Sequence, residues 1–330
     1  MNEKKKWKLT GFLVQWEMIL IYLLLLINIL LMLARPNLYF ASGTITSIIQ
    51  SGMDLCPLVL GMALVMMMGE IDVSCAANMI FCSMTTGLLM DRGVPAVVCV
   101  LAGIATGVLL GMFNGVLVGY VGMPSVIVTI SNSLLYRGVV KIILDVNVLR
   151  NFPAFYTKLA WNQIAGIPLA MIIFLLMAAV FVVILQKTGF GRKLYIIGNN
   201  AVTAEYSGIN VRKTKLAVYL IMGVMCGIAS IFFVGRMGGG VSSTMGVGYE
   251  MNAIAICALG GISTSGGKGK MYGPIISTFI MAFLIYTLGL MGVDANAKKT
   301  LTGLVLLIAV LIPNINKDLF ASVRRKFRKI

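Results

Sequence analysis

The sequence contains no histidine and carries little charge. Asp, Glu, Lys and Arg together make up only 12% of its 330 residues. The absence of histidine excludes His-ligated metal sites, His-based catalytic triads and His proton relays. Soluble domains carry roughly 25% charged residues, whereas this chain is 59% hydrophobic with a mean hydropathy of +0.97. The composition therefore excludes a soluble globule and indicates an integral membrane protein.

Polar and apolar residues do not alternate along the chain, and the cysteines are not paired in sequence. Membrane β-strands alternate the two kinds of residue, but this sequence has long uninterrupted apolar runs, so the membrane-spanning segments are expected to be helices. The six cysteines form no C-x-x-C pair and all lie in apolar stretches. Thiols in such surroundings pack as small hydrophobic side chains, and no metal site is expected.

The charged residues divide the chain into about ten apolar segments, each close to the roughly 20 residues that a helix needs to cross a bilayer. These segments are Met18–Ala34, Pro36–Gly69, Val73–Met90, two within Gly93–Tyr136, Leu159–Gln186, Leu216–Gly235, Met251–Gly267, Met271–Val293 and Thr300–Asn316. The turn inside Gly93–Tyr136 is expected near Tyr120–Pro124, where Gly122 and Pro124 discourage helix. The sequence predicts an all-α polytopic membrane protein, with residues 1–330 forming a single transmembrane domain.

The basic residues predict how the chain is oriented. Most of the 27 Lys and Arg residues fall in residues 1–16, 187–215, 268–270 and 317–330. Short loops rich in Lys and Arg stay on the cytoplasmic side, so both termini are expected to be cytoplasmic. The net charge of +16 then reflects orientation and contact with anionic membrane lipids, and no nucleic-acid partner is expected.

Glycines recur every four residues through the fourth expected span. Residues spaced in this way share one face of a helix, and a row of small residues lets a neighbouring helix approach closely. The row predicts a helix-packing seam, with Asn114 beside it as the one embedded polar group that could also meet a ligand. The seam consists of Gly103, Gly107, Gly111, Gly115 and Gly119.

Two carboxylates, Glu70 and Asp72, stand in the run Gly69–Ser74, where the second expected span ends. This run has two interpretations: a solvated turn, or a broken helix whose backbone and carboxylates line a water-filled cavity. Gly260–Ser265 matches the run at half of its positions, which is a weak sign of internal duplication. The glycines that follow lack the spacing of a phosphate-binding loop, so no nucleotide site is expected.

The segment Gly198–Ile209 has the features of a short capped helix between basic flanks. Asn199 and Asn200 are candidate N-caps, and Gly208 is a candidate residue for the position just after the helix. A two-turn helix fits between them at the cytoplasmic face. A connecting loop needs no such caps, so a docking site for another protein is the favoured interpretation, with a connecting loop as the alternative.

At these residues the sequence resembles the permease subunits of bacterial ABC importers for ribose, xylose, related simple sugars and autoinducer-2. The resemblance extends roughly from Pro36 to Pro313. Its motifs are Gly69–Ser74, Gly111–Gly115, Pro124–Thr129, Tyr136–Gly138, Gly198–Ile209, Gly248–Ala255 and Gly260–Gly269. The chain departs from the family pattern at Glu70, Cys75, Ile130, Ser131, Val202 and Thr203.

The resemblance implies a ten-helix, multi-pass transport subunit of the bacterial plasma (inner) membrane that is not itself an enzyme. It would pair with a second copy or a homologue, with cytoplasmic ABC ATPases and with an extracytoplasmic sugar-binding protein. ATP and Mg would bind to the ATPase, and this chain would hold no cofactor. The loop 187–215 would carry the helix that couples it to the ATPase, through Asn199, Asn200, Thr203, Ala204, Glu205, Gly208 and Ile209.

A path for a neutral, hydroxyl-rich solute needs neutral hydrogen-bonding groups and could include a carboxylate. The candidates near the expected span ends and interruptions are Asp72, Asn114, Thr129, Ser131 and Asn132. The alternatives without a role in transport are hydrogen bonds between helices for Asn114 and Asn132, and a solvated turn for Asp72.

The leading hypothesis is an ATP-driven importer of a monosaccharide or similar small polar solute. One rival is a proton-coupled secondary transporter that uses Asp54, Glu70 and Asp72 as carriers. Another is the related permease class for branched-chain amino acids. A membrane-embedded enzyme is more distant, because the sequence shows no catalytic constellation.

Overall fold

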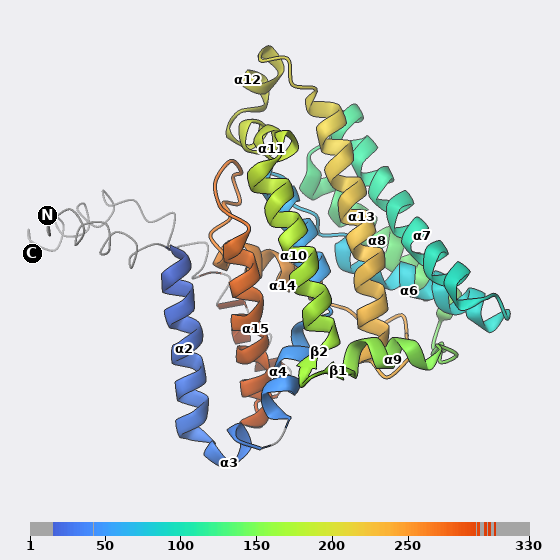
Figure 1. Ribbon diagram of the computed structural model, residues 1–330. Helices are drawn as coiled ribbons and strands as arrows, with labels where there is room; N and C mark the ends of the chain where they lie inside the picture. Colours follow the sequence, from blue (N-terminus) through green and yellow to red (C-terminus); the bar gives the residue numbers. More distant parts are fainter. Residues whose placement is uncertain are drawn as a thin grey trace, which may run out of the picture.

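The computed structural model describes residues 16–41, 43–294, 296–297, 300–301, 303–304 and 307, which are mostly helical (Figure 1). The helices are α2 (Trp16–Ala34), α3 (Pro36–Tyr39), α4 (Thr44–Gly52), α5 (Cys56–Met67), α6 (Cys75–Asp91), α7 (Ala96–Val116), the π-helix η1 (Leu117–Val121), α8 (Ser125–Leu144), α9 (Ala154–Trp161), α10 (Leu169–Lys187), α11 (Gly189–Asn199), α12 (Ala201–Tyr206), α13 (Val211–Arg236), α14 (Tyr249–Leu259) and α15 (Tyr272–Leu290). The one sheet in the described residues is an antiparallel hairpin of β1 (Gln163–Ile164) and β2 (Ile167–Pro168). The basic tail 317–330, residues 1–15 and most of the expected span Thr300–Asn316 lie outside the described residues.

Helix α5 forms the centre of the bundle. Every residue from Cys56 to Met67 is buried, and the helix packs against α13, α14, α15 and α10. Its sequence is apolar on all sides, as expected for a helix enclosed by protein. The surrounding helices expose large apolar side chains such as Leu101 and Leu176, which match lipid tails in polarity. The chain is therefore built as a multi-pass membrane protein with an enclosed central helix.

Six described helices are long and apolar enough to cross a membrane: α2, α7 continued by η1, α8, α10, α13 and α15. Helices α4 and α5 would make a seventh span, bent by 44° at their junction. The expected number of about ten is not confirmed. Helix α6 has only 17 residues and α14 only 11, and the last expected span lies mostly outside the described residues. Counting uncharged residues overestimates the length of α14, because the helix ends at Leu259, well before the next charged residue, Lys268.

Two of the expected segments are interrupted in different ways. The turn expected at Tyr120–Pro124 is present: η1 ends at Gly122, which has a φ of +82°, and α8 begins directly after Pro124. The segment expected at Leu159–Gln186 is divided, because α9 ends at Trp161 and the hairpin precedes α10. Each break contains a glycine and a proline, Gly122 and Pro124 in the first and Gly166 and Pro168 in the second, which a helix accommodates poorly.

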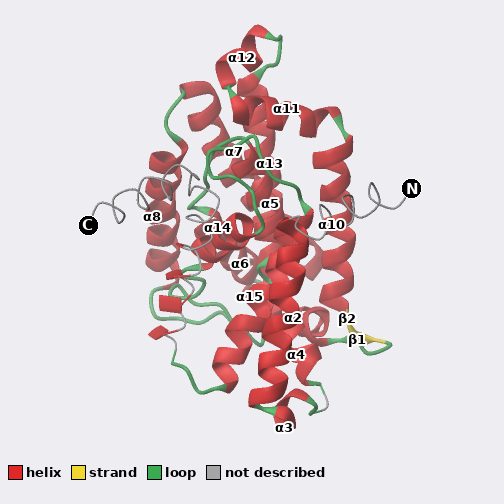
Figure 2. Cartoon of the chain, turned by 90° about the vertical axis from the view of Figure 1, so that its left-hand side faces the viewer, coloured by secondary structure: helices red, strands yellow, loops and turns green. Residues whose placement is uncertain are grey.

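The bundle has two distinct ends. Helices α11 and α12 project at one end, called the α12 end below, whereas α3, α9 and the hairpin lie at the other (Figures 1 and 2). The loop 187–215, expected to hold one short helix, therefore holds two. The side of the membrane that each end faces remains a prediction from the basic residues.

Candidate functional site

A continuous chain of hydrogen bonds crosses the interior between α6, α7 and α8. The Asp72 carboxylate accepts from the backbone N–H and the hydroxyl of Ser74, at 2.8 and 2.6 Å. Asn114 Nδ2 donates to Ser74 Oγ at 2.7 Å, and Asn132 Nδ2 donates to Asn114 Oδ1 at 2.6 Å. All four residues are buried. The structure thus brings together three of the predicted substrate-path residues, and it adds Ser74, which was not singled out from the sequence.

The other two predicted path residues lie on different faces of α8. Thr129 is buried, and its hydroxyl donates to the Ser125 carbonyl at 2.9 Å and approaches the Ile71 carbonyl at 3.3 Å. It therefore ties α8 to the segment that carries Asp72. Ser131 instead lies on the exposed face of α8, next to Ile130 and Leu134. Of the five residues, Ser131 alone is open to a molecule outside this chain.

Asp72 is only 2% exposed, so its carboxylate does not lie in solvent, whereas Gly69 at the start of the same run is exposed. The Asp72 side chain is enclosed by protein, where its carboxylate accepts two hydrogen bonds from Ser74. Non-helical backbone at membrane depth is tolerated only where protein or a cavity satisfies its polar groups. Within the described residues, Asp72 meets this requirement through Ser74.

Helices α5 and α14 end in the same way. Gly69, with a φ of +78°, follows α5, and the next residue, Glu70, donates its N–H to the Val65 carbonyl. Gly261, with a φ of +80°, follows α14, and Ile262 donates to Cys257 across the same number of residues. Both are glycine caps of the Schellman type. The equivalent of Gly69 is therefore Gly261, one residue later than the partial repeat in the sequence suggests.

The glycine row on α7 lies against α13. A side chain at Gly107 or Gly111 would collide with the backbone of Gly223, and one at Gly115 would collide with Leu216. Gly119 faces the start of α13, whereas Gly103 faces Thr86 of α6. The same overlap occurs in the reverse direction from Gly223 to Gly107. The two helices consequently touch backbone to backbone, as small residues permit in membranes.

Two ion pairs link the segments beside α5 to α13, one at each end of the bundle. Arg236 Nε donates to Asp54 Oδ2 at 2.7 Å, and the Tyr249 hydroxyl donates to the same oxygen at 2.7 Å. At the α12 end Lys215 pairs with Glu70. The sequence showed these charges within or beside apolar segments, but it gave no signal of which charges meet.

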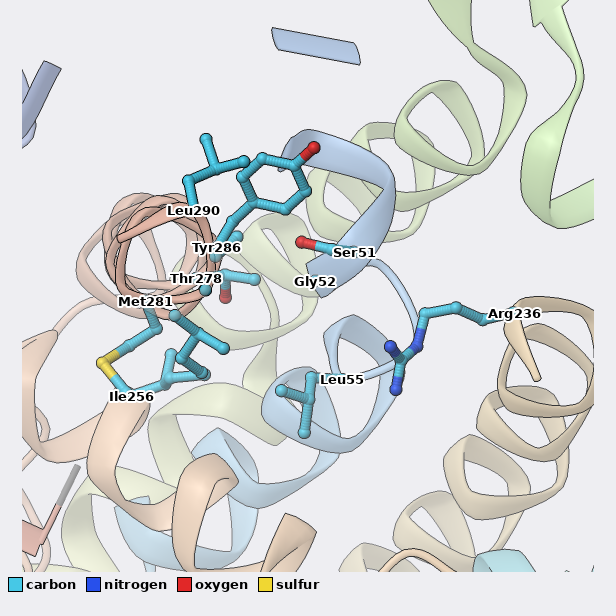
Figure 3. Close-up of a pocket in the computed structure, with 12 residues that line it drawn as sticks. Ser51, Gly52, Leu55, Arg236, Ile256, Thr278, Met281, Tyr286 and Leu290 are labelled. Atoms are coloured by element: carbon cyan, nitrogen blue, oxygen red, sulfur yellow. The ribbon is translucent and has the colours of Figure 1, made fainter. Parts of the chain in front are cut away.

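A cavity of about 330 Å³ lies beside the first of these ion pairs. The guanidinium of Arg236 faces it together with Leu55, and Ser51, Thr278 and Tyr286 supply hydroxyl groups from α4 and α15 (Figure 3). Because Asp54 balances the charge of Arg236, the cavity offers hydroxyl groups without a net charge. Such a lining suits a neutral polar molecule better than an ion.

The predicted coupling segment forms a capped helix at the tip of the α12 end. Asn200 Oδ1 accepts from the Thr203 N–H at 3.0 Å, and Gly208 follows the helix with a φ of +78°. The predicted coupling residues do not all face outward. Asn199, Asn200, Thr203, Glu205 and Gly208 are exposed, and Ile209 is half-buried.

Ala204 is fully buried against this chain, so it is not available to a docking partner. The residues that project most are Val202, which is 61% exposed, and Tyr206, which is 90% exposed. They are four residues apart and so share a face of α12. In the sequence, Val202 stands out only as a departure from the family pattern, and Tyr206 is not among the predicted coupling residues. The spacing of these two apolar side chains in a polar loop is the signal that could have identified them.

Comparison with known proteins gives one family. Residues 44–310 match the family described as branched-chain amino acid transport system / permease component. The chain is 31% identical over 291 residues to the autoinducer 2 import system permease protein LsrC of Escherichia coli O157:H7, covering 87% of this chain and 84% of that one. It is also 31% identical over 274 residues to the protein of the same name from Salmonella typhi, covering 83% and 79%. No solved structure matches.

The family match covers most of the chain, and the relatives align with it over most of their own length. The bundle of apolar helices around an enclosed α5 agrees with a permease, and the residues quoted for the resemblance fall within the matched range. The chain belongs to this family of ABC transporter permeases.

Proposed function

We propose that this chain is the transmembrane subunit of an ATP-driven importer in the bacterial plasma membrane, and that it carries a monosaccharide or a similar small polar solute. The observation that carries the proposal is α12, a capped helix at the tip of the bundle that exposes Val202 and Tyr206. An exposed pair of this kind on a polar loop is typical of a protein contact. A cytoplasmic ABC ATPase is the partner, and it supplies ATP hydrolysis and holds Mg.

The charge pairing argues against a proton-coupled carrier. Of the three carboxylates that could move protons, Asp54 is paired with Arg236 and Glu70 with Lys215. Each of these two carboxylates therefore already has a structural role, in which it ties one end of α5 to α13. Only Asp72 has no cationic partner among the described residues. The energy for transport is therefore assigned to the ATPase.

The nature of the solute follows from the polar groups and from the relatives. The cavity beside Arg236 offers hydroxyl groups with little net charge, because Asp54 balances the guanidinium. The relatives are named for import of autoinducer 2 and not of an amino acid. The family description names branched-chain amino acids, whose ammonium and carboxylate groups would need charged partners. A sugar-like solute is the better fit.

In this proposal the solute passes between two permease copies, after delivery by an extracytoplasmic binding protein. Ser131, on the exposed face of α8, is then the predicted path residue that faces the solute. Helices α6, α7 and α8 are held together behind that face by Asp72, Asn114, Thr129 and Asn132. The ATPase contact is bordered by the exposed residues Asn199, Asn200, Thr203, Glu205 and Gly208.

The proposal is tested by uptake into proteoliposomes that contain the permease, its ATPase and its binding protein. Labelled ribose, autoinducer 2 and leucine are compared with ATP supplied at the ATPase side, and again with only a proton gradient. We expect ATP-dependent uptake of ribose or autoinducer 2 and no uptake of leucine. Uptake driven by the proton gradient alone would contradict the proposal, and so would a preference for leucine.

A further inference from the structure

Four glycines from three separate segments meet at the base of the coupling loop. Gly69 follows α5, Gly198 lies in the last turn of α11, and Gly266 and Gly267 belong to the loop between α14 and α15. We call these four residues the glycine junction. The Gly267 N–H donates to the Met67 carbonyl at 2.9 Å, so the loop is bonded directly to the end of α5.

The contacts at the junction are between backbones. A methyl group at Gly198 would lie 3.0 Å from Gly267 Cα and closer still to the Met67 carbonyl. A methyl group at Gly266 would lie 2.7 Å from Gly69 Cα and 3.0 Å from Gly198 Cα. Real Cβ atoms do not approach other atoms this closely. Each segment therefore fits against the others only because glycine stands at the contact.

The junction touches the coupling loop on both sides of α12. Before α12, Gly198 is two residues from the cap residue Asn200. After α12, Lys215 in the first turns of α13 pairs with Glu70, the residue next to Gly69. Tyr195 of α11 adds a hydrogen bond from its hydroxyl to the Gly269 carbonyl at 2.7 Å. A displacement of α12 would therefore reach the end of α5 through two contacts, one before α12 in the chain and one after it.

The far side of the junction leads to the buried parts of the protein. From Gly69 the chain passes to Asp72, where the hydrogen bonds to Ser74, Asn114 and Asn132 begin. From Gly266 and Gly267 the loop leads into α14 and α15, which pack against α5. Packed backbone shifts as a unit and does not deform continuously.

We propose that the glycine junction transmits movement of α12 to α5 and to the loop between α14 and α15, with Gly198 and Gly267 as positioning residues for transport. The proposal rests on the proposed function, because it assumes that an ATPase moves α12. It assigns a role in coupling to glycines that lie beneath the exposed face of α12 formed by Val202 and Tyr206.

The first test compares Gly198→Ala with Gly189→Ala. Both glycines lie in α11, but a methyl group at Gly189 meets only Arg192 Nη2, at 3.7 Å. The readouts are recovery of the ATPase with the permease, ATP hydrolysis, and solute taken up per ATP hydrolysed. We expect Gly198→Ala to bind the ATPase and hydrolyse ATP like the wild type, while the solute taken up per ATP falls about tenfold. A change of this size lies within the usual range of coupling free energies between two sites. Gly189→Ala should match the wild type.

An unchanged ratio of uptake to hydrolysis in Gly198→Ala would overturn the proposal. The proposed function fails by a different result, namely no ATP-dependent uptake by the wild type.

A second measurement decides the matter if Gly198→Ala does not assemble. Labels are placed at Lys193→Cys on α11 and Ser265→Cys in the loop, both exposed, while all six native cysteines are buried. The distance between the labels is measured in the otherwise unchanged complex, with and without ATP. We expect the distance to stay constant, because the two segments move together. A distance that changes with ATP would show that the junction separates, and would overturn the proposal.

Discussion

Asp54 and Arg236 hold α5 and α13 together at the end of the bundle opposite α12. The Arg236 Nε donates to Asp54 Oδ2 at 2.7 Å, and Asp54 is only 1% exposed. Glu70 and Lys215 join the same two elements at the α12 end. The enclosed helix α5 is thus fixed to α13 by one ion pair beyond each of its ends. The arrangement ties α5 to α13 at both ends of the shorter helix.

The ion pair makes a prediction about stability. Arg236→Met leaves the Asp54 carboxylate buried without its cation, which costs about 3–5 kcal/mol of unfolding free energy. Adding Asp54→Asn removes the stranded charge, so the double variant should unfold at a higher temperature than Arg236→Met alone. Thermal unfolding in detergent measures the difference. If the effect of the double variant equals the sum of the effects of Arg236→Met alone and Asp54→Asn alone, the two residues do not interact.

Replacing glycine by alanine should change stability in opposite directions inside and outside the glycine seam. Gly111→Ala forces a methyl group into the backbone of α13 and should destabilise the protein by about 1–3 kcal/mol. Gly138→Ala adds the same group to α8 where nothing lies within 4 Å, and alanine stabilises a helix over glycine by up to about 1 kcal/mol. The yield and the unfolding temperature of each variant are compared. Equal effects at both positions would mean that the seam is not a close contact.

The buried hydrogen-bond chain predicts a loss of transport without a loss of assembly. Asp72→Asn removes the charge but keeps an oxygen that can accept from Ser74. We expect uptake to fall more than about tenfold while the ATPase still binds and hydrolyses ATP, because intramembrane carboxylates are costly and are retained for function. Uptake and ATP hydrolysis are measured on the same preparation. Unchanged uptake would show that the negative charge of Asp72 is not needed for transport.

Composition and charge spacing were enough to predict a helical membrane protein, the long helices α2, α7, α8, α13 and α15, and the turn at Gly122. These features depend on local sequence: apolar runs, glycines and prolines. The sequence was less informative about α6 and α14, because short helices inside a bundle are stabilised by the surrounding protein and need not span the bilayer. Whether such a short segment forms a helix depends on its burial in the tertiary structure and not on its length.

The candidate site was predictable in its components but not in its connections. The caps at Asn200 and Gly208 are local, and they were identified from the sequence. Whether Ala204 faces a partner depends on how α12 packs against its own chain, and this the sequence does not specify. The same holds for the pairs Asp54–Arg236 and Glu70–Lys215, whose members are far apart along the chain.

The central claim, that α12 is the site where an ATPase drives this permease, is tested most directly by the affinity between the two proteins. The proposed partner ABC ATPase is titrated against wild-type permease, Tyr206→Ala, and the control Val146→Ala, whose side chain is 85% exposed outside α12. Loss of an exposed aromatic anchor costs about 2 kcal/mol or more, equivalent to roughly 30-fold weaker binding. We predict that loss for Tyr206→Ala and wild-type affinity for Val146→Ala. ATPase binding that is equally tight in all three proteins would contradict the account.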